Sequence, residues 1–189
     1  MNLPQSTPST DSLAAAQQDM RFAYLGGGPG MLASSIIWFA AGMTAWLESP
    51  RLAVWVLLIG GMFIHPLGLL LLRAFKRPAR HAADNPLGRL ALETTVWMIF
   101  GMLICLGVAQ IRQELFFPAM LLTIGGRYLT FATIYGDRIY WLVGLVLAIS
   151  GWVLAASGAH PALGAFAGAA IEIAFALVII LRAKGTASN

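Results

Sequence analysis

Six long apolar stretches constrain this chain more than any other feature. They are bounded by charged residues, Gly or Pro, and cover 31–47, 52–72, 90–111, 115–135, 140–157 and 162–181. Each has 17 to 22 residues, close to the ~20 that an α-helix needs to cross the ~30 Å hydrocarbon core of a bilayer. A membrane-spanning strand would need only ~10 residues. We therefore predict an all-α fold: a polytopic membrane bundle of six transmembrane helices over residues 31–182.

The composition excludes a soluble globular domain. Hydrophobic residues make up 59% of the chain and charged residues only 11%, whereas a soluble domain has about 25% charged residues. The net charge of +4 would be compatible with nucleic-acid binding. However, the excess bases lie in a loop beside the membrane and no recognition motif accompanies them, so we predict no nucleic-acid partner. These bases are Arg73, Lys76, Arg77 and Arg80.

The distribution of Lys and Arg predicts the orientation. Nine lie on one side of the predicted spans, and only Arg51 and Arg112 lie on the other side. From this bias we predict that both termini lie in the cytoplasm. The basic loop is then a topology signal, and the alternative is that it contacts anionic lipid. We expect an N-terminal tail over 1–30 and a C-terminal tail over 183–189.

The N-terminal tail contains one predicted helix outside the six spans. Residues 12–24 can form a short amphipathic helix on the membrane surface, with Ser9, Thr10 or Asp11 as its cap. The run GGGPG at 26–30 then breaks that helix. No apolar core of signal-peptide length precedes it, so we expect no cleaved leader.

The spans show signs of an internal repeat. Gly60-Gly61 precedes His65, Gly125-Gly126 precedes Thr130, and Ala167-Gly168 precedes Glu172, always with the polar residue four positions beyond the second small one. This spacing suggests three repeated helical hairpins. Chance matching in an apolar background remains the alternative, because small residues are common in membrane helices.

Four ionisable residues lie inside the predicted spans. At the helical rise of ~1.5 Å per residue, His65, Arg127 and Glu172 lie ~12 to 15 Å from the cytoplasmic end, and Glu93 lies at ~6 Å. An isolated charge near the bilayer centre costs at least ~2.5 to 3.5 kcal/mol. We therefore predict a pair between Arg127 and Glu172, with Glu93 as the competing partner. The layer is either a binding or proton-relay site or a structural ion pair.

Small residues accompany these polar positions. Gly164 and Gly168 recur at helical spacing on the face that carries Glu172. Gly126 lies beside Arg127, and Gly61 shares a face with His65. Small residues let helix backbones approach closely in membranes, so we predict helix packing at all four glycines.

The sequence carries no known catalytic motif. No span serine is flanked by glycines, and HExxH is absent. The single Cys105 excludes an internal disulfide and a cysteine-based metal cluster. We predict no metal and no cofactor, and an enzyme is the least favoured class. The enzyme class that the sequence leaves open is a carboxylate-dependent lipid hydrolase that uses Glu93 and Glu172.

Three segments suggest a family. The runs NPLGRLALE at 85–93, FFPAM at 116–120 and GGRYLTFATIYGDRIYW at 125–141 resemble an uncharacterised bacterial family of about this length with about six membrane helices. The resemblance covers the middle third of the chain. It implies the fold class and a bacterial inner-membrane location, but no activity.

Two functional hypotheses follow. The first is a small transporter-like or ligand-binding bundle whose layer of Arg127, Glu172 and His65 handles a small polar or anionic solute or a proton. The second is a non-catalytic protein that acts by association, including as a homo-oligomer. It would use Gly164 and Gly168 as a packing surface and the 73–89 loop as a cytoplasmic or lipid contact.

Overall fold

The computed structural model of the chain describes residues 10–185, which form helices and no strand. Six helical segments in this part of the chain are long and apolar enough to cross a membrane. This confirms the predicted six-helix membrane bundle. The helices are α1 (Thr10–Tyr24), α2 (Gly28–Leu47), α3 (Pro50–Ala74), α4 (Pro86–Ile111), α5 (Phe116–Tyr135), α6 (Ile139–Ala156) and α7 (Pro161–Gly185), with short 3-10 turns η1 (Leu25–Gly27) and η2 (Gln113–Leu115).

Proline and capping residues explain where three spans begin. Pro50, Pro86 and Pro161 are the first residues of α3, α4 and α7. Proline suits this position because its missing N–H would have no partner in the helix. The side chains of Ser49 and Asn85 cap α3 and α4, accepting hydrogen bonds from the second or third residue that follows.

The α1–α2 junction is a sharp turn. Leu25, Gly26 and Gly27 all have positive φ, and the last reaches 87°. Glycine adopts these angles readily, but a leucine does so only when its surroundings hold it there. Leu25 is held by burial, with 1% of its surface exposed. The predicted break between the N-terminal helix and the first span therefore occurs here. Residues 1–9, which include the possible cap Ser9, and residues 186–189 lie outside the described part of the chain.

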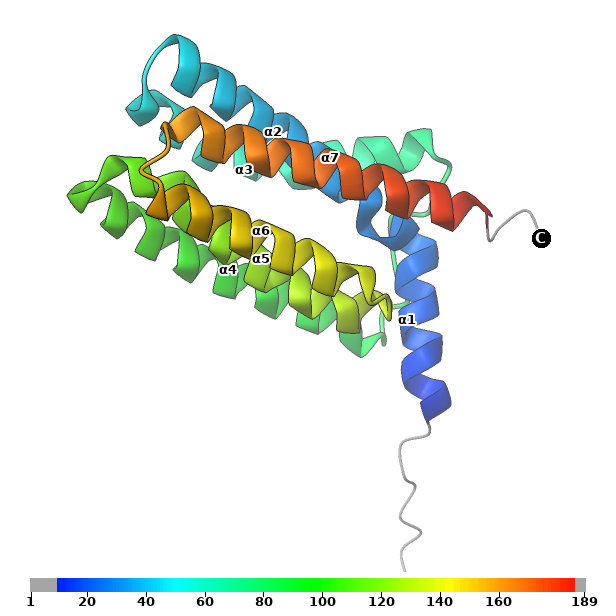
Figure 1. The fold of residues 1–189 in the computed structure, drawn as a ribbon. Coiled ribbons are helices and arrows are strands. Elements are labelled where there is room, and N and C mark those ends of the chain that lie inside the picture. Colours follow the sequence, from blue (N-terminus) through cyan, green and yellow to red (C-terminus); the bar gives the residue numbers. More distant parts are fainter. Residues whose placement is uncertain (1–9, 186–189) are drawn as a thin grey trace, which may run out of the picture.

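The six long helices form two neighbouring groups, and α1 crosses one end of them (Figure 1). α2 packs mainly on α3 and α7, whereas α5 packs mainly on α6 and then α4. The consecutive pair α6 and α7 is in much less extensive contact than α2 and α3. The helices thus do not pack as three equivalent hairpins.

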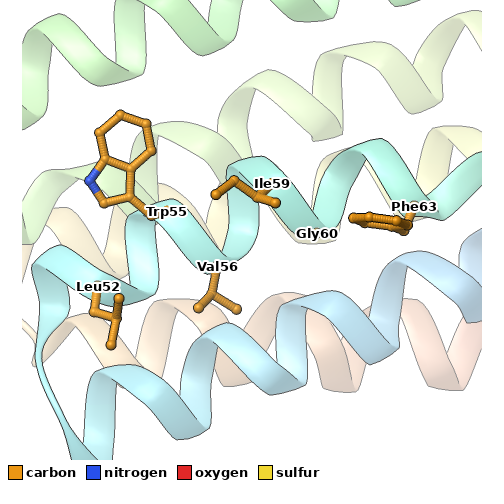
Figure 2. Close-up of a pocket in the computed structure, with 6 residues that line it drawn as sticks. All are labelled: Leu52, Trp55, Val56, Ile59, Gly60 and Phe63. Atoms are coloured by element: carbon orange, nitrogen blue, oxygen red, sulfur yellow. The ribbon is translucent and has the colours of Figure 1, made fainter.

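The outer helices α3 and α4 expose large apolar side chains. On α3 these include Trp55, Ile59 and Phe63, which line a shallow apolar pocket together with Leu52, Val56 and Gly60 (Figure 2). On α4, Trp97 and Ile104 are similarly exposed. Such surfaces are suited to hydrocarbon rather than water.

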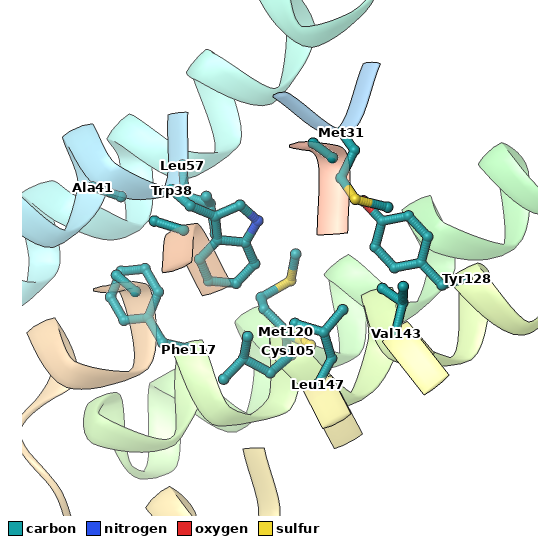
Figure 3. Packing of buried hydrophobic residues seen from close by; sticks show 14 of the residues in the cluster. Met31, Trp38, Ala41, Leu57, Cys105, Phe117, Met120, Tyr128, Val143 and Leu147 are labelled. Carbon is teal, nitrogen blue, oxygen red and sulfur yellow. The ribbon is translucent and has the colours of Figure 1, made fainter. Parts of the chain in front are cut away.

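The core lies where the two groups meet. Trp38 from α2, Phe117 and Met120 from α5, Cys105 from α4 and Leu147 from α6 belong to one buried cluster (Figure 3). Tyr128 belongs to the same cluster but carries a hydroxyl group. The Tyr128 hydroxyl therefore places a polar group at the edge of the apolar core.

Candidate functional site

Glu172 lies in the bundle interior with 0% of its surface exposed. The Tyr128 hydroxyl on α5 donates a hydrogen bond of 2.7 Å to its Oε1 atom. The hydroxyl of Ser34 on α2 lies beside the same carboxyl group. The second carboxyl oxygen, Oε2, is buried and has no hydrogen-bond partner. Three helices thus enclose one carboxyl group whose hydrogen-bonding capacity is only partly used.

Small residues bring α7 close enough to form this site. A Cβ atom on Gly168 would lie 2.7 Å from the Trp38 ring, and one on Gly164 would lie 2.8 Å from the Cβ of Phe117. Neither distance is compatible with a real side chain. The face of α7 that carries Glu172 is therefore pressed against α2 and α5.

The other two predicted packing glycines behave differently. Gly61 on α3 and Gly126 on α5 have open space where a Cβ atom would stand. Gly126 is also exposed. The prediction that these two glycines pack against a neighbouring helix is wrong, because Gly61 shares a face of α3 with the exposed His65, and Gly126 is itself exposed on α5.

Arg127 does not pair with Glu172. Its guanidinium group donates to Thr95 Oγ1 at 3.0 Å and to Met98 Sδ at 3.1 Å, both on α4, and lies 5.2 Å from the centre of the Phe131 ring. Its Nε atom is buried without a partner. Consecutive residues of a helix point ~100° apart, so Tyr128 faces α7 while Arg127 faces α4. The predicted ion pair is replaced by a tyrosine–carboxyl hydrogen bond.

His65 and Glu93 are exposed on α3 and α4. Their predicted depths were counted along the helices, but depth does not determine which way a side chain points around the helix axis. Neither residue reaches Glu172, so the predicted layer of His65, Arg127 and Glu172 does not form. A hydrolase that uses Glu93 and Glu172 together is also incompatible with this placement.

Within residues 10–185, the salt bridges lie near helix ends rather than in the core. Arg112 pairs with Glu114 at 2.8 Å, and Arg182 pairs with Asp137 at 3.6 Å. The same residues contain no group of three His, Cys, Asp or Glu side chains that could hold a metal ion. The buried Glu172 thus depends on neutral hydroxyl groups.

Three tyrosines form an aromatic cluster beside Glu172. The ring of Tyr140 on α6 stacks on Tyr128, with centroids 6.1 Å apart, and on Tyr135, with centroids 5.5 Å apart. Phe131 packs edge-on against this group. The Tyr140 hydroxyl donates to the carbonyl of Gly26 at the α1–α2 junction. The cluster therefore extends from the carboxyl group to the end of the bundle where α1 lies.

Tyr128, Tyr140 and Ser34 were not among the site residues predicted from the sequence. One signal was available for the tyrosines. Tyr128, Phe131 and Tyr135 follow one another at spacings of three and four, which places them on one face of a helix. Nothing in the sequence indicated that this face meets α6 and α7.

The fold and this site define a multi-pass membrane protein with a buried carboxyl group in its helical interior. The chain belongs to a family of unknown function (DUF7010), which it matches over residues 13–182. Comparison with curated proteins and with solved structures found no match.

Proposed function

We propose that this membrane protein binds and releases a proton at Glu172. The observation that carries the proposal is the full burial of this carboxyl group, with Tyr128 bonded to one oxygen and no partner on the other. Ionisable groups inside membrane bundles are costly and commonly mark proton or ion pathways. No cation is bonded to Glu172 within the described residues, so a proton is the simplest species that can neutralise it.

A proton fits this site better than a solute. Two pockets in the described part of the chain lie away from this fully enclosed carboxyl group, one on the outer face of α3 and one between α1 and residues 82–86. Neither is lined by Glu172 or Tyr128. A solute would need such a cavity, whereas a proton needs only hydrogen-bonding groups.

The proposal can be tested by infrared spectroscopy of the protein in lipid nanodiscs. Wild type should show the carbonyl band of a protonated carboxylic acid, and Glu172→Gln should remove it. Glu93→Gln is the matched control, because it alters an exposed carboxyl group in another span, α4. A band that survives in Glu172→Gln, or that disappears only in Glu93→Gln, would contradict the proposal.

A flux assay extends this test to transport. Protein in liposomes with an internal pH dye should equilibrate an imposed pH gradient faster than empty liposomes. Glu172→Gln should abolish that difference and Glu93→Gln should keep it. Equal flux in wild type and Glu172→Gln would exclude transport through this residue.

The alternative function is association with another molecule through the α7 glycines, but in this fold that face of α7 is already covered. Gly164 and Gly168 already pack against Phe117 and Trp38 of the same chain. A homo-oligomer would have to use other faces, such as the exposed apolar sides of α3 and α4.

We also propose that the basic loop contacts anionic lipid. Arg73, Lys76 and Arg80 are exposed, and Arg77 lies 5.2 Å from the centre of the Phe22 ring on α1. Bases at a membrane surface are attracted to anionic headgroups by ~1 kcal/mol each. Replacing the three exposed bases with Gln should weaken binding of anionic lipid, which native mass spectrometry can measure.

A further inference from the structure

A buried proton-binding group needs a route to water. Glu172 is fully enclosed, and Arg127, one position from Tyr128, is directed to α4. On the other side, the tyrosine cluster extends from the carboxyl group toward the α1 end of the bundle. The cluster is therefore the polar connection that leads away from Glu172.

The inner half of this connection consists of Tyr128, Tyr140 and Tyr135. Tyr128 is bonded directly to Glu172. Tyr140 is stacked between the other two rings, and its hydroxyl reaches the backbone of Gly26. A Cβ atom on Gly27 would lie 2.8 Å from the Tyr140 hydroxyl and equally close to the Tyr135 ring. The glycine thus leaves room for both side chains to meet at the junction.

The outer half consists of Tyr24 and His81. Tyr24 is the last residue of α1 and packs against the buried cluster that contains Tyr135 and Tyr140. Its hydroxyl shares a hydrogen bond of 2.8 Å with His81 Nδ1. His81 belongs to the loop between α3 and α4, and the next residue of that loop, Ala82, donates its backbone N–H to the half-buried Asp19. This end of the connection lies near the surface of the bundle.

We infer that Tyr128, Tyr140, Tyr135, Tyr24 and His81 form the proton route between Glu172 and the α1 end of the bundle. The inference rests on the proposed function of Glu172. When Glu172 takes up a proton, Tyr128 passes its hydroxyl proton to Oε1 of Glu172 and receives another from the Tyr140 hydroxyl. Tyr140, Tyr135 and Tyr24 each give a proton inward and receive one from the next group outward. His81 gives its proton to Tyr24 and takes one from a hydronium ion, so Glu172 gains one proton and every other group of the route is restored. Tyr128, Tyr140 and Tyr135 are in ring contact and not directly hydrogen-bonded to one another, so transfer between their hydroxyl groups proceeds through water or hydroxyl rotation.

A purely structural role for the tyrosines makes a different prediction. Stacking depends on the rings, whereas proton transfer depends on the hydroxyl groups. Tyr→Phe substitution keeps the ring and removes the hydroxyl. If the cluster only packs, such variants change stability but not the rate at which Glu172 exchanges its proton.

The test is the rate of hydrogen–deuterium exchange at the protonated Glu172, followed by its infrared carbonyl band after transfer of nanodiscs to D₂O. Tyr140→Phe should keep the band amplitude and slow exchange by at least about tenfold. Trp141→Phe is the matched control, because it changes an exposed neighbouring aromatic residue, and it should exchange like wild type.

Each outcome is decisive. An unchanged rate in Tyr140→Phe with the band present overturns the route and leaves the proposed function intact. Absence of a Glu172 band in wild type overturns both. If Tyr140→Phe does not fold, Tyr24→Phe at the outer end decides the question, because the route predicts slower exchange there as well.

Discussion

Gly168 makes a close contact between α7 and α2. A Cβ atom there would lie 2.7 Å from the ring of Trp38, a side chain that is 1% exposed. The indole cannot move away without displacing the rest of the core. We expect Gly168→Ala to lower the free energy of unfolding by about 1–3 kcal/mol, the usual cost of overpacking.

The measurement is reversible unfolding in mixed detergent micelles. Gly126→Ala is the control, because that position lies in a helix, is exposed and has open space. Removing a helical glycine there should leave stability unchanged or raise it by up to about 1 kcal/mol. Equal losses in both variants would show that glycine flexibility, not the contact with Trp38, determines the effect.

Arg127 is a cation held by neutral groups. Its partners are a hydroxyl, a thioether and an aromatic ring, and its Nε atom is unsatisfied. Replacing a buried charge with an apolar side chain of similar size is often neutral or stabilising. We expect Arg127→Met to leave the free energy of unfolding unchanged or to raise it by about 1 kcal/mol.

The smaller variant separates volume from charge. Arg127→Ala should lower the free energy of unfolding by about 2 kcal/mol or more because it leaves a cavity. Both can be measured by the same unfolding assay. A loss of that size in Arg127→Met as well would show that the charge itself is needed, and that an anionic partner binds it in the membrane.

At the scale of elements, α1 is held across the bundle end by polar bonds. Asp19 accepts hydrogen bonds from the backbone N–H of Ala82 at 2.9 Å and from Asn85 at 2.8 Å. Gln17 and Arg21 donate to the carbonyls of Thr133 and Tyr135 at the end of α5. These bonds join α1 both to the loop after α3 and to α5.

We expect Asp19→Ala to loosen that loop. The substitution removes the acceptor for the Ala82 amide, so amide hydrogen exchange over 79–85 should become faster. Exchange in the middle of α5 should stay as in wild type. Gln18→Ala, which changes an exposed neighbour on α1, is the control. Unchanged exchange over 79–85 in Asp19→Ala would mean that other contacts hold the loop.

The helices could be predicted from sequence, but their rotation could not. Apolar length and flanking charge determine that a segment spans the bilayer and how deep each residue lies. Which side faces inward depends on tertiary contacts, such as the backbone approach of Gly125 on α5 to Gly144 on α6. Glu172 was correctly expected to face the interior, since it shares a face with Gly168. His65 is exposed instead, and the small residue on its face, Gly61, has open space where a Cβ atom would stand.

At the scale of the whole molecule, several segments gather at one end of the bundle. α1, the loop between α3 and α4, and the end of α7 all lie there (Figure 1). Most of the basic residues outside the predicted spans belong to these segments, whereas Arg51 and Arg112 lie toward the opposite end. The fold therefore gathers positive charge at one end of the bundle. The positive-inside rule associates such an end with the cytoplasm.

We expect the α1 end to face the cytoplasm, and cysteine labelling can measure this. Cys105 is the single cysteine and is 2% exposed, so Cys105→Ala gives a background without thiols. In that background, Ala83→Cys in the α3–α4 loop should react with a membrane-impermeant reagent only after the cells are opened. Ser157→Cys, at the end of α6, should react in intact cells, because an odd number of spans separates the two positions. The reverse pattern would show that the charge bias does not set the orientation, and would place the His81 end of the proton route outside the cell.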